Sequence, residues 1–393
     1  MSPFFVFVLV IIMMSALLRV DFFFTILYLF VGIYMVLRIW SDRITRNLFV
    51  QRDFLTHAFV GDEIRVNLKI RNQSRLPIPW LMVNEAIHWR LATTSSLRQV
   101  TSLKGKEDCG FTYRLKAKRR GYYKVGPTVV HTGDILGLRP DFRENLDADY
   151  LVVYPKIIPL VELGLPTHSP QAVLPAALPI FEDPAHITGI RGYNWGDNPR
   201  HIHWPATAIT GKVMIKQFRP AVARESAIFL NLTRSDYTRR YREPAIELAI
   251  TTAASLAYHI LTKEKLPVGF YTTAMDPFHR EIEYFQLPPV KEQHQLPQIL
   301  DILARIEPID SGEFLKNLRH KAVHLSWGST VIVISGERSN VLSEALIWLK
   351  HQGLHPVLVL VEMYREPKRL KTEPIPTFEI GQEKDIETWG LTP

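Results

Sequence analysis

The chain is nearly free of cysteine and lacks several motifs that mark common enzymes. Its single cysteine, Cys109, excludes an internal disulfide framework and every zinc site built from several cysteines. The 393 residues contain no G-x-x-x-x-G-K-[ST] phosphate loop and no G-x-S-x-G nucleophile elbow. The one histidine-rich stretch has no pair of carboxylates that could complete an acid–base mechanism. We therefore predict a non-enzymatic protein and assign no catalytic residue.

The charged fraction of the chain is ordinary, and the sequence contains no low-complexity tract. Charged residues make up 22% and apolar residues 47% of the chain, as in ordinary globular proteins. The net charge is +8, but the basic residues are dispersed rather than gathered with aromatic residues, which argues against nucleic acid as a partner. Attraction to anionic lipid headgroups is the simpler reason for the excess. A lipid- or polymer-binding role rests on this charge alone.

Charge is absent altogether from two apolar runs, residues 4–18 and 22–37, which Arg19 and Asp21 separate. Each run with its polar flanks can cross a bilayer core of ~30 Å as a helix. We predict a transmembrane helical hairpin over residues 1–40 that contacts lipid through residues 4–37; the alternative is a pair of buried helices in a soluble core. Cations follow the second run, so the positive-inside rule places the C-terminal body in the cytoplasm; they are Arg38, Arg43, Arg46 and Arg52.

Residues 41–155 carry the two-residue apolar period of half-buried strands. The clearest case is the stretch FVGDEIRVNLKIRN, whose alternating apolar residues are Ile64, Val66, Leu68 and Ile70. Several short strands with glycine and proline between them favour an immunoglobulin-like β-sandwich. Residues 156–190 follow, and their six prolines predict an extended linker.

Residues 221–393 alternate between strand-like and helix-like patterns. Continuous apolar runs such as SAIFLNL and STVIVISG are separated by runs with helical spacing such as VLSEALIWLKHQG. This alternation predicts a doubly wound parallel sheet covered by helices. The expected fold class is therefore multi-domain, α/β plus all-β, and ligands of the sheet would gather at the carboxyl ends of its strands.

The stretch GYNWGDNPRHIHW, residues 192–204, concentrates the residues that carry chemistry. If it forms a strand, His201 and His203 share one face, with Ile202 and Trp204 on the other. Two imidazoles could bind zinc with Asp197 as a third ligand. One hypothesis is therefore a metal-dependent hydrolase acting on cell-envelope material.

A second interpretation of the same stretch needs no chemistry. Gly196 and Asp197 form a turn, and Arg191 and Arg200 are possible ion-pair partners of the aspartate. Aromatic residues supply packing area, so the segment could fasten two domains together. Tryptophan, tyrosine and arginine also dominate binding hot spots, so it could equally dock a partner. The aromatic residues are Tyr193, Trp195 and Trp204.

This pattern resembles the core of the domain-of-unknown-function 58 (DUF58) family, and we refer to residues 191–220 as the signature segment. The matching residues are Arg191, Tyr193, Gly196, Asp197, Arg200, Ile202, His203 and Trp204. An upstream stretch, RRGYYKVGPTVVHTGDILGL, is similar to a second motif of that family through Arg120, Gly121, Tyr123, Gly126, Pro127, Asp134, Gly137 and Leu138. After the tryptophan the family commonly has alanine-arginine, whereas this chain has Ala208 and Ile209.

The resemblance implies a von Willebrand factor A-like C-terminal domain. That fold often holds Mg²⁺ at a metal-ion-dependent adhesion site with the pattern D-x-S-x-S after the first strand. Here the degenerate positions are Asn231, Thr233 and Ser235, and a neutral amide is a poorer ligand than a carboxylate. A later strand ends at Ser335 without the aspartate often found there. We expect no cofactor, with Mg²⁺ at these positions as the one possibility.

The resemblance also implies partners and a location. Such proteins look like partners of MoxR-type AAA+ ATPases, in systems that include other von Willebrand factor A proteins and transglutaminase-like membrane proteins. We therefore expect a multi-pass protein of the bacterial inner (cytoplasmic) membrane. It would be an adaptor with a chaperone-like or assembly role, and the ATPase would supply the work.

Overall fold

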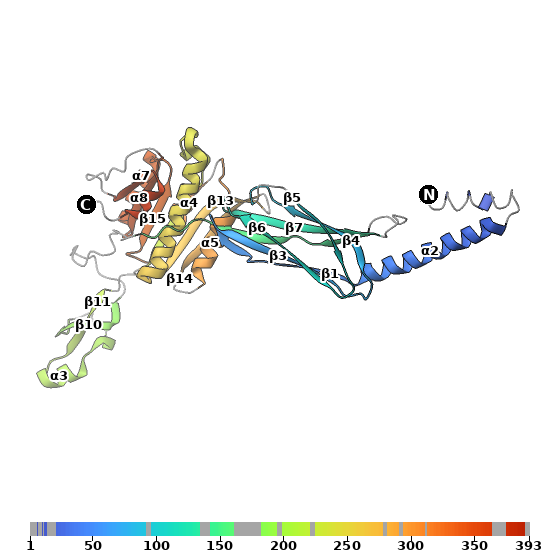
Figure 1. Cartoon of the computed structure of the whole chain (residues 1–393). Coiled ribbons are helices and arrows are strands. Elements are labelled where there is room, and N and C mark those ends of the chain that lie inside the picture. The colour runs from blue at the N-terminus through green and yellow to red at the C-terminus, as the bar shows by residue number, and fades with distance from the viewer. Residues whose placement is uncertain are drawn as a thin grey trace. The chain divides into compact units, whose positions relative to one another are not determined.

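The computed structural model describes residues 21–91, 96–133, 142–160, 182–194, 199–220, 225–277, 281–290, 294–310, 313–363 and 375–389, with four single positions before residue 21. The chain divides into two compact units (Figure 1). Unit 1 comprises residues 1–156 with 303–305, and unit 2 comprises residues 157–302 with 306–393. Each unit is described by itself below.

Unit 1 begins with helix α2, Asp21–Arg46, which contains the second predicted apolar run. Residues 24–44 of this helix are long and apolar enough to cross a membrane, and the 18-residue apolar window within them is unburied. Tyr28 and Leu29 are 72% and 61% exposed. The first predicted run, residues 4–18, lies almost wholly outside the described residues. Another apolar helix that is long enough, Arg239–Glu264, is mostly buried and belongs to the core of unit 2.

The last turns of α2 pack into the β-structure of unit 1. Ile44 is 3% exposed and shares a hydrophobic cluster with Leu48 and Leu81, against which Trp40 also packs. The indole Nε1 of Trp40 donates a hydrogen bond of 3.2 Å to the carbonyl of Pro77. Strand β1 begins at Leu48, two residues after the helix ends. The helix and the strands therefore share one core.

The described residues of unit 1 form nine strands in two sheets. One sheet has the order β1-β3-β6, and the other has the order β2-β9-β7-β4-β5 with β8 paired to β7. The predicted alternation is confirmed in β3, whose apolar residues are buried between the sheets. The strands are β1 Leu48–Asp53, β2 His57–Phe59, β3 Glu63–Asn72, β4 Ile78–Ile87, β5 Ser96–Leu103, β6 Asp108–Lys116, β7 Gly121–Thr132, β8 Phe142–Leu146 and β9 Asp149–Tyr154.

A buried ion pair joins the two sheets of unit 1. The side chains of Arg52 on β1 and Glu85 on β4 are both 0% exposed, and Arg52 Nε lies 2.9 Å from Glu85 Oε1. The same guanidinium donates to Asp149 and Thr128 at 2.6 and 2.7 Å, and the hydroxyl of Tyr113 donates to Glu85 at 3.0 Å. Thr128 also donates to the second oxygen of Glu85. The two buried charges thus have several partners, as such charges require.

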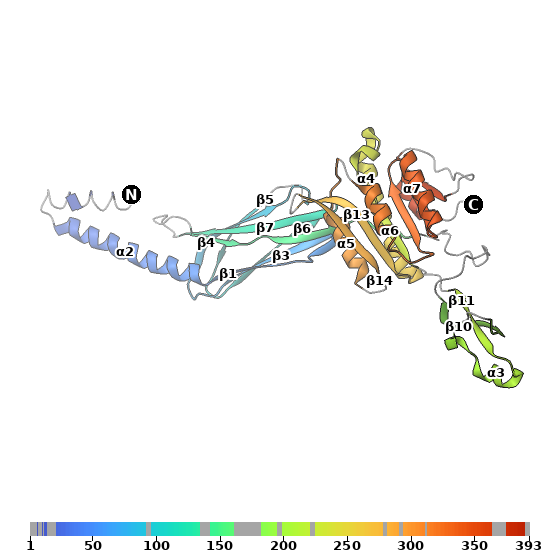
Figure 2. The same ribbon diagram turned by 180° about the vertical axis from the view of Figure 1, so that it is seen from behind.

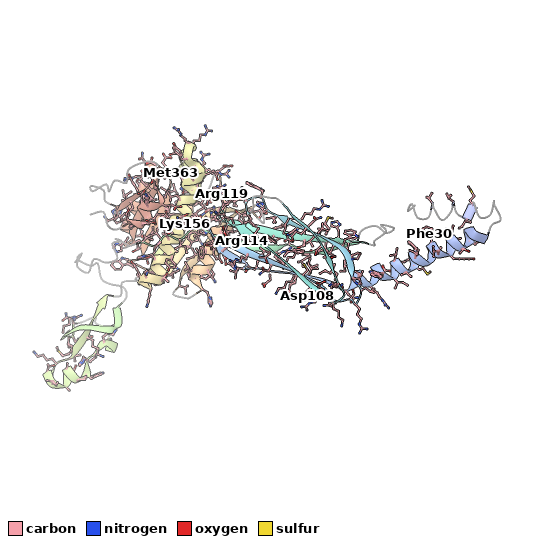
Figure 3. All side chains as sticks on the ribbon, viewed as in Figure 1. Phe30, Asp108, Arg114, Arg119, Lys156 and Met363 are labelled. Atoms are coloured by element: carbon pink, nitrogen blue, oxygen red, sulfur yellow. The ribbon has the colours of Figure 1, made fainter. Side chains whose placement is uncertain are left out.

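Gly126 of the upstream family-like motif lies directly against this ion pair. Its φ is +95°, a conformation that favours glycine. A Cβ atom built at this position would lie 2.3 Å from Nη2 of Arg52. The glycine therefore leaves space for the guanidinium. By contrast, the Arg71–Asp108 pair of β3 and β6 is exposed on the surface, where Figure 3 labels Asp108.

Unit 2 is built on a six-stranded sheet with the order β14-β13-β12-β15-β16-β17. Strands β13, β12, β15, β16 and β17 run parallel to one another, and the edge strand β14 is antiparallel to β13. The predicted parallel sheet is therefore a mixed sheet. The strands are β12 Ser226–Leu230, β13 Val268–Asp276, β14 Glu281–Val290, β15 Thr330–Ser335, β16 His355–Val361 and β17 Thr377–Ile380.

Helices cover both faces of this sheet. Successive side chains of a strand point to opposite faces, so every residue of a central strand is buried when both faces are covered. Phe229, Val331 and Leu358 pack with α6 and α7 in one cluster, and α4 contacts the sheet through β12, β15 and β16. Helix α4 lies over the sheet in Figure 1, and α6 and α7 lie over it in Figure 2. The helices are α4 Arg242–His259, α5 Gln295–Arg305, α6 Phe314–Ala322, α7 Asn340–His351 and α8 Glu383–Glu387.

The segment between residues 156 and 225 is only partly described. Ile158 and Leu160 are buried, and the backbone N–H of Ile158 donates to Ser255 Oγ on α4 at 2.9 Å. Strand β10 spans Glu182–Gly192, so the expected linker over 156–190 contains most of a strand. Beyond it come the 3-10 turn η2, Pro199–His201, helix α3, Trp204–Thr210, and strand β11, Met214–Pro220.

Candidate functional site

The signature segment folds as a two-stranded hairpin with a short helix at its tip. Strands β10 and β11 pair antiparallel, with Arg191 opposite Ile215 and Gly192 opposite Met214. The pairing extends through a hydrogen bond of 2.9 Å from the Tyr193 N–H to the Val213 carbonyl. The hairpin thus holds the two ends of the segment together and leaves η2 and α3 between them.

The strand considered for residues 201–204 is wrong. His201 ends the 3-10 turn, and Trp204 is the first residue of α3, so the two histidines do not share a strand face. Pro205 explains this local choice, since proline is favoured in the first turn of a helix and its fixed φ suits that position.

His203 is the N-cap of α3. Its Nδ1 accepts a hydrogen bond of 3.0 Å from the Ala206 N–H, and its carbonyl accepts from Thr207. The Thr207 hydroxyl in turn accepts the Met214 N–H, which ties the helix to β11. Because Nδ1 is the acceptor, the neutral ring carries its proton on Nε2. The helix ends at Gly211, whose φ of +67° is the left-handed conformation typical of such ends.

The signature segment exposes large apolar side chains. Trp204 is 69% and Ile209 is 86% exposed, and Tyr193 is 39% exposed. Trp204 and Ala208 are four residues apart, so they lie on one helix face, and no residue of α3 is buried. Exposed patches of this kind mark interaction sites more often than isolated surface residues do.

Part of the predicted site lies outside the described residues. This holds for Trp195, Gly196 and Asp197, and therefore for every ion pair or metal ligand set predicted to include the aspartate. Of the others, Arg191 donates a hydrogen bond of 3.1 Å to the carbonyl of Gly192, and the backbone of Arg200 lies in η2. Within the part of the chain that the structure describes, no group of three or more His, Cys, Asp or Glu residues is placed to hold a metal ion.

The second predicted site lies where the strand order of the unit 2 sheet reverses, at the carboxyl ends of β12 and β15. Ligands of doubly wound sheets bind at this point. Asn231 and Ser335 are 2% and 1% exposed there, and Thr233 is 7% exposed. Ser235 is exposed, so the three degenerate positions are only partly brought together.

Asn231 is the centre of a hydrogen-bond network at this reversal point. Its Oδ1 accepts the Thr233 N–H at 3.0 Å, and its Nδ2 donates to Asp236 Oδ2 at 2.7 Å and Ser335 Oγ at 3.2 Å. The hydroxyl of Tyr237 donates to the Asn231 carbonyl at 2.6 Å, and burial raises the pKa of this phenol. A cation site needs oxygens that converge on the ion. Here Asp236 Oδ2 and Ser335 Oγ converge on Asn231 Nδ2, so this set of side chains does not fit a cation.

Sequence reasoning missed two parts of these sites. Tyr237 supports the Asn231 loop, but a tyrosine two residues beyond a polar motif carries no spacing signal. The cap formed by His203 was also missed, because histidine is not among the residues that favour this position. The proline after Trp204 is the signal that could have indicated the helix start.

Comparison with protein families gives one match. Residues 189–351 match the family described as "Protein of unknown function DUF58". This finding supports the resemblance, and the matched residues include the whole signature segment and the reversal point of the sheet. No curated protein matches the chain.

Solved structures give only partial similarities. The CARDB domain of a Pyrococcus furiosus protein in complex with di-metal ions is 18% identical over 27% of this chain and 91% of that one, with a TM-score of 0.22. The cupredoxin domain of amoB from Nitrosocaldus yellowstonii is 12% identical over 28% and 87%, with a TM-score of 0.20. A beta-glucosidase from Listeria innocua is 14% identical over 27% and only 16%, with a TM-score of 0.19. TM-scores of this size assign neither a fold nor a function.

Proposed function

We propose that this chain, whose residues 189–351 match the DUF58 family, is a non-enzymatic, membrane-anchored adaptor. It works with a MoxR-type AAA+ ATPase in a chaperone-like or assembly role, in systems with other von Willebrand factor A or transglutaminase-like membrane proteins. The chain has no phosphate loop of the G-x-x-x-x-G-K-[ST] type, so in this proposal the ATPase supplies the energy.

The observation that carries this proposal is the surface of the signature segment. Its described polar groups serve the local fold, since His203 caps α3 and Thr207 fastens the helix to β11. Several of its apolar side chains face solvent, with Ile209 and Trp204 the most exposed. A site for catalysis would need the reverse arrangement, with polar groups directed at a bound reactant. An exposed tryptophan on a preformed helix is instead typical of a binding anchor.

The proposed location is the bacterial inner membrane, with the body of the protein in the cytoplasm. Helix α2 supports one span, because residues 24–44 include an 18-residue apolar window that is unburied. The arginines at and after its C-terminal end, including Arg38 and Arg43, favour the cytoplasmic side for that end. The first apolar run, residues 4–18, would supply the second span of the hairpin.

We also infer the finer fold of each unit. The two packed sheets of unit 1 support an immunoglobulin-like sandwich, since residues from both sheets form one core. The strand order of unit 2, in which the first strand lies at the centre and the chain winds outward in both directions, supports a von Willebrand factor A-like domain.

The test is recovery of the ATPase with the tagged full-length chain from its own cells. We expect an AAA+ ATPase to co-purify, and Trp204→Ala and Asp197→Ala to reduce its recovery. Trp89→Ala is the matched control, because Trp89 is 66% exposed, close to the 69% of Trp204, but lies outside the signature segment. Thermal unfolding of each variant in detergent separates loss of binding from loss of folding.

Three outcomes would contradict the proposal. Equal loss with Trp89→Ala would show that any exposed tryptophan has the same effect. Unfolding of the Trp204 and Asp197 variants would favour a role in holding domains together. Hydrolysis of cell-envelope material by the purified chain, lost with Asp197→Ala in a folded protein, would favour the metal-dependent hydrolase.

A further inference from the structure

The carboxyl ends of β12 and β15 bring together oxygen atoms that all point at one side-chain nitrogen. Asp236 Oδ2 and Ser335 Oγ lie 2.7 and 3.2 Å from Asn231 Nδ2. The orientation of the amide is fixed from both sides. Thr233 N–H needs an acceptor and meets Oδ1, while the Asp236 carboxylate needs a donor and meets Nδ2. The nitrogen thus occupies the point toward which the oxygens converge.

We propose that the Asn231 amide takes the place of a divalent cation and closes this site to metal ions. A primary amide has two N–H donors, and here one serves Asp236 and the other serves Ser335. The second carboxylate oxygen of Asp236 accepts from Ser235 Oγ at 2.9 Å, and the Ser335 hydroxyl donates to the Glu337 carbonyl at 3.2 Å. Both oxygens of Asp236 and the hydroxyl oxygen of Ser335 are therefore already in hydrogen bonds.

The two loops that carry these residues are in direct contact. A Cβ atom at Gly336 would lie 2.3 Å from Cδ1 of Tyr237 and 2.5 Å from the carbonyl oxygen of Asp236. The loop after β15 therefore rests directly on the turn after β12. Tyr237 is 2% exposed and holds that turn through its bond to the Asn231 carbonyl. A cation at the point between Asp236 Oδ2 and Ser335 Oγ would need to displace the amide, because Asn231 Nδ2 already occupies that point.

This reasoning gives Asn231→Asp a specific outcome. The substitution replaces the two donors by a second carboxylate next to that of Asp236, and two such groups repel when both are charged. The variant should therefore unfold at a lower temperature than the natural protein in the absence of metal. A divalent cation between the two carboxylates should restore the lost stability.

The experiment measures thermal unfolding of the full-length chain in detergent, after treatment with a chelator and with millimolar Mg²⁺ or Mn²⁺. We expect no shift for the natural protein and an upward shift for Asn231→Asp, with one Mn²⁺ bound per chain by equilibrium dialysis. Asn72→Asp is the matched control. Asn72 is also buried, but its Nδ2 donates at 2.9 Å to the neutral carbonyls of Leu76 and Lys104, so this variant offers one carboxylate where Asn231→Asp offers two and should bind Mn²⁺ more weakly.

Two results would overturn the proposal. Stoichiometric Mn²⁺ binding by the natural protein, with a matching rise in unfolding temperature, would show that Asn231 does not close the site. A folded Asn231→Asp variant that gains no cation would show that the amide does not lie at a cation position. If the variant does not fold even with Mn²⁺, dialysis of the natural protein still decides the question.

Discussion

Replacing Arg52 by methionine should weaken unit 1 more than any surface ion-pair substitution. The change leaves the Glu85 carboxylate in a site where its side chain is 0% exposed. Glu85 keeps hydrogen bonds from Tyr113 and Thr128 but loses its only buried cationic partner among the described residues. Asp149 also loses the guanidinium, but it is half exposed and can be hydrated.

The magnitude follows from the burial of both charges. Removing one partner of a buried ion pair costs about 3–5 kcal/mol, because the remaining charge is left without compensation. For a domain of this size, that corresponds to a decrease of roughly 10–20 °C in the unfolding temperature. Methionine fills much of the volume that the arginine stem occupied, so the loss arises mainly from the charge.

The assay is thermal unfolding of the full-length chain in detergent, followed by circular dichroism of the β-structure. Arg71→Met is the control, because Arg71 and Asp108 form a pair at 2.7 Å on strands β3 and β6 with both side chains more than half exposed. We expect that variant to unfold close to the natural protein. If Arg52→Met and Arg71→Met unfold together, the buried pair does not stabilise unit 1 as argued.

Two further predictions concern packing and pH. Gly126→Ala should destabilise unit 1, because its φ is +95° and the added Cβ would meet the guanidinium of Arg52. In the Arg52→Met background, the same substitution should lower the free energy of unfolding by less. Equal losses in both backgrounds of a double-mutant cycle would disprove the contact. Burial lowers the pKa of His259 below its ordinary 6.5, so the unfolded chain takes up the proton first and stability should fall as the pH drops below about 6.5. His259→Gln should flatten this decrease in urea unfolding measured at about pH 7.5 and about pH 5.5, and an unchanged slope would contradict it.

Much of the fold could be predicted because its signals are local. The period of two in β3 follows from one face being buried, and the alternation of apolar runs in unit 2 follows from helices covering both faces of the sheet. The antiparallel edge strand β14 was not predicted. It contains Pro288 and Pro289. An edge strand tolerates proline, but in the sequence two prolines indicate the end of a strand.

The candidate sites were less predictable because their chemistry depends on atoms that are distant in sequence. The neutral side chain at Asn231 was evident, but its donors meet Ser335, which is 104 residues away. Likewise, the sequence indicated only that Gly126 of the upstream motif punctuates the strands. Its packing against Arg52, which lies on another strand, appears only in the folded chain.

The junction between α2 and the β-structure has a mechanical consequence. Ile44 and Trp40 anchor the end of the helix in the same cluster as the first strand, and no loop of more than a residue or two intervenes. A bilayer that is thicker or thinner changes the inclination of a spanning helix. Because this joint is stiff, unit 1 would rotate together with such a helix, so the orientation of its strands would report the thickness of the membrane.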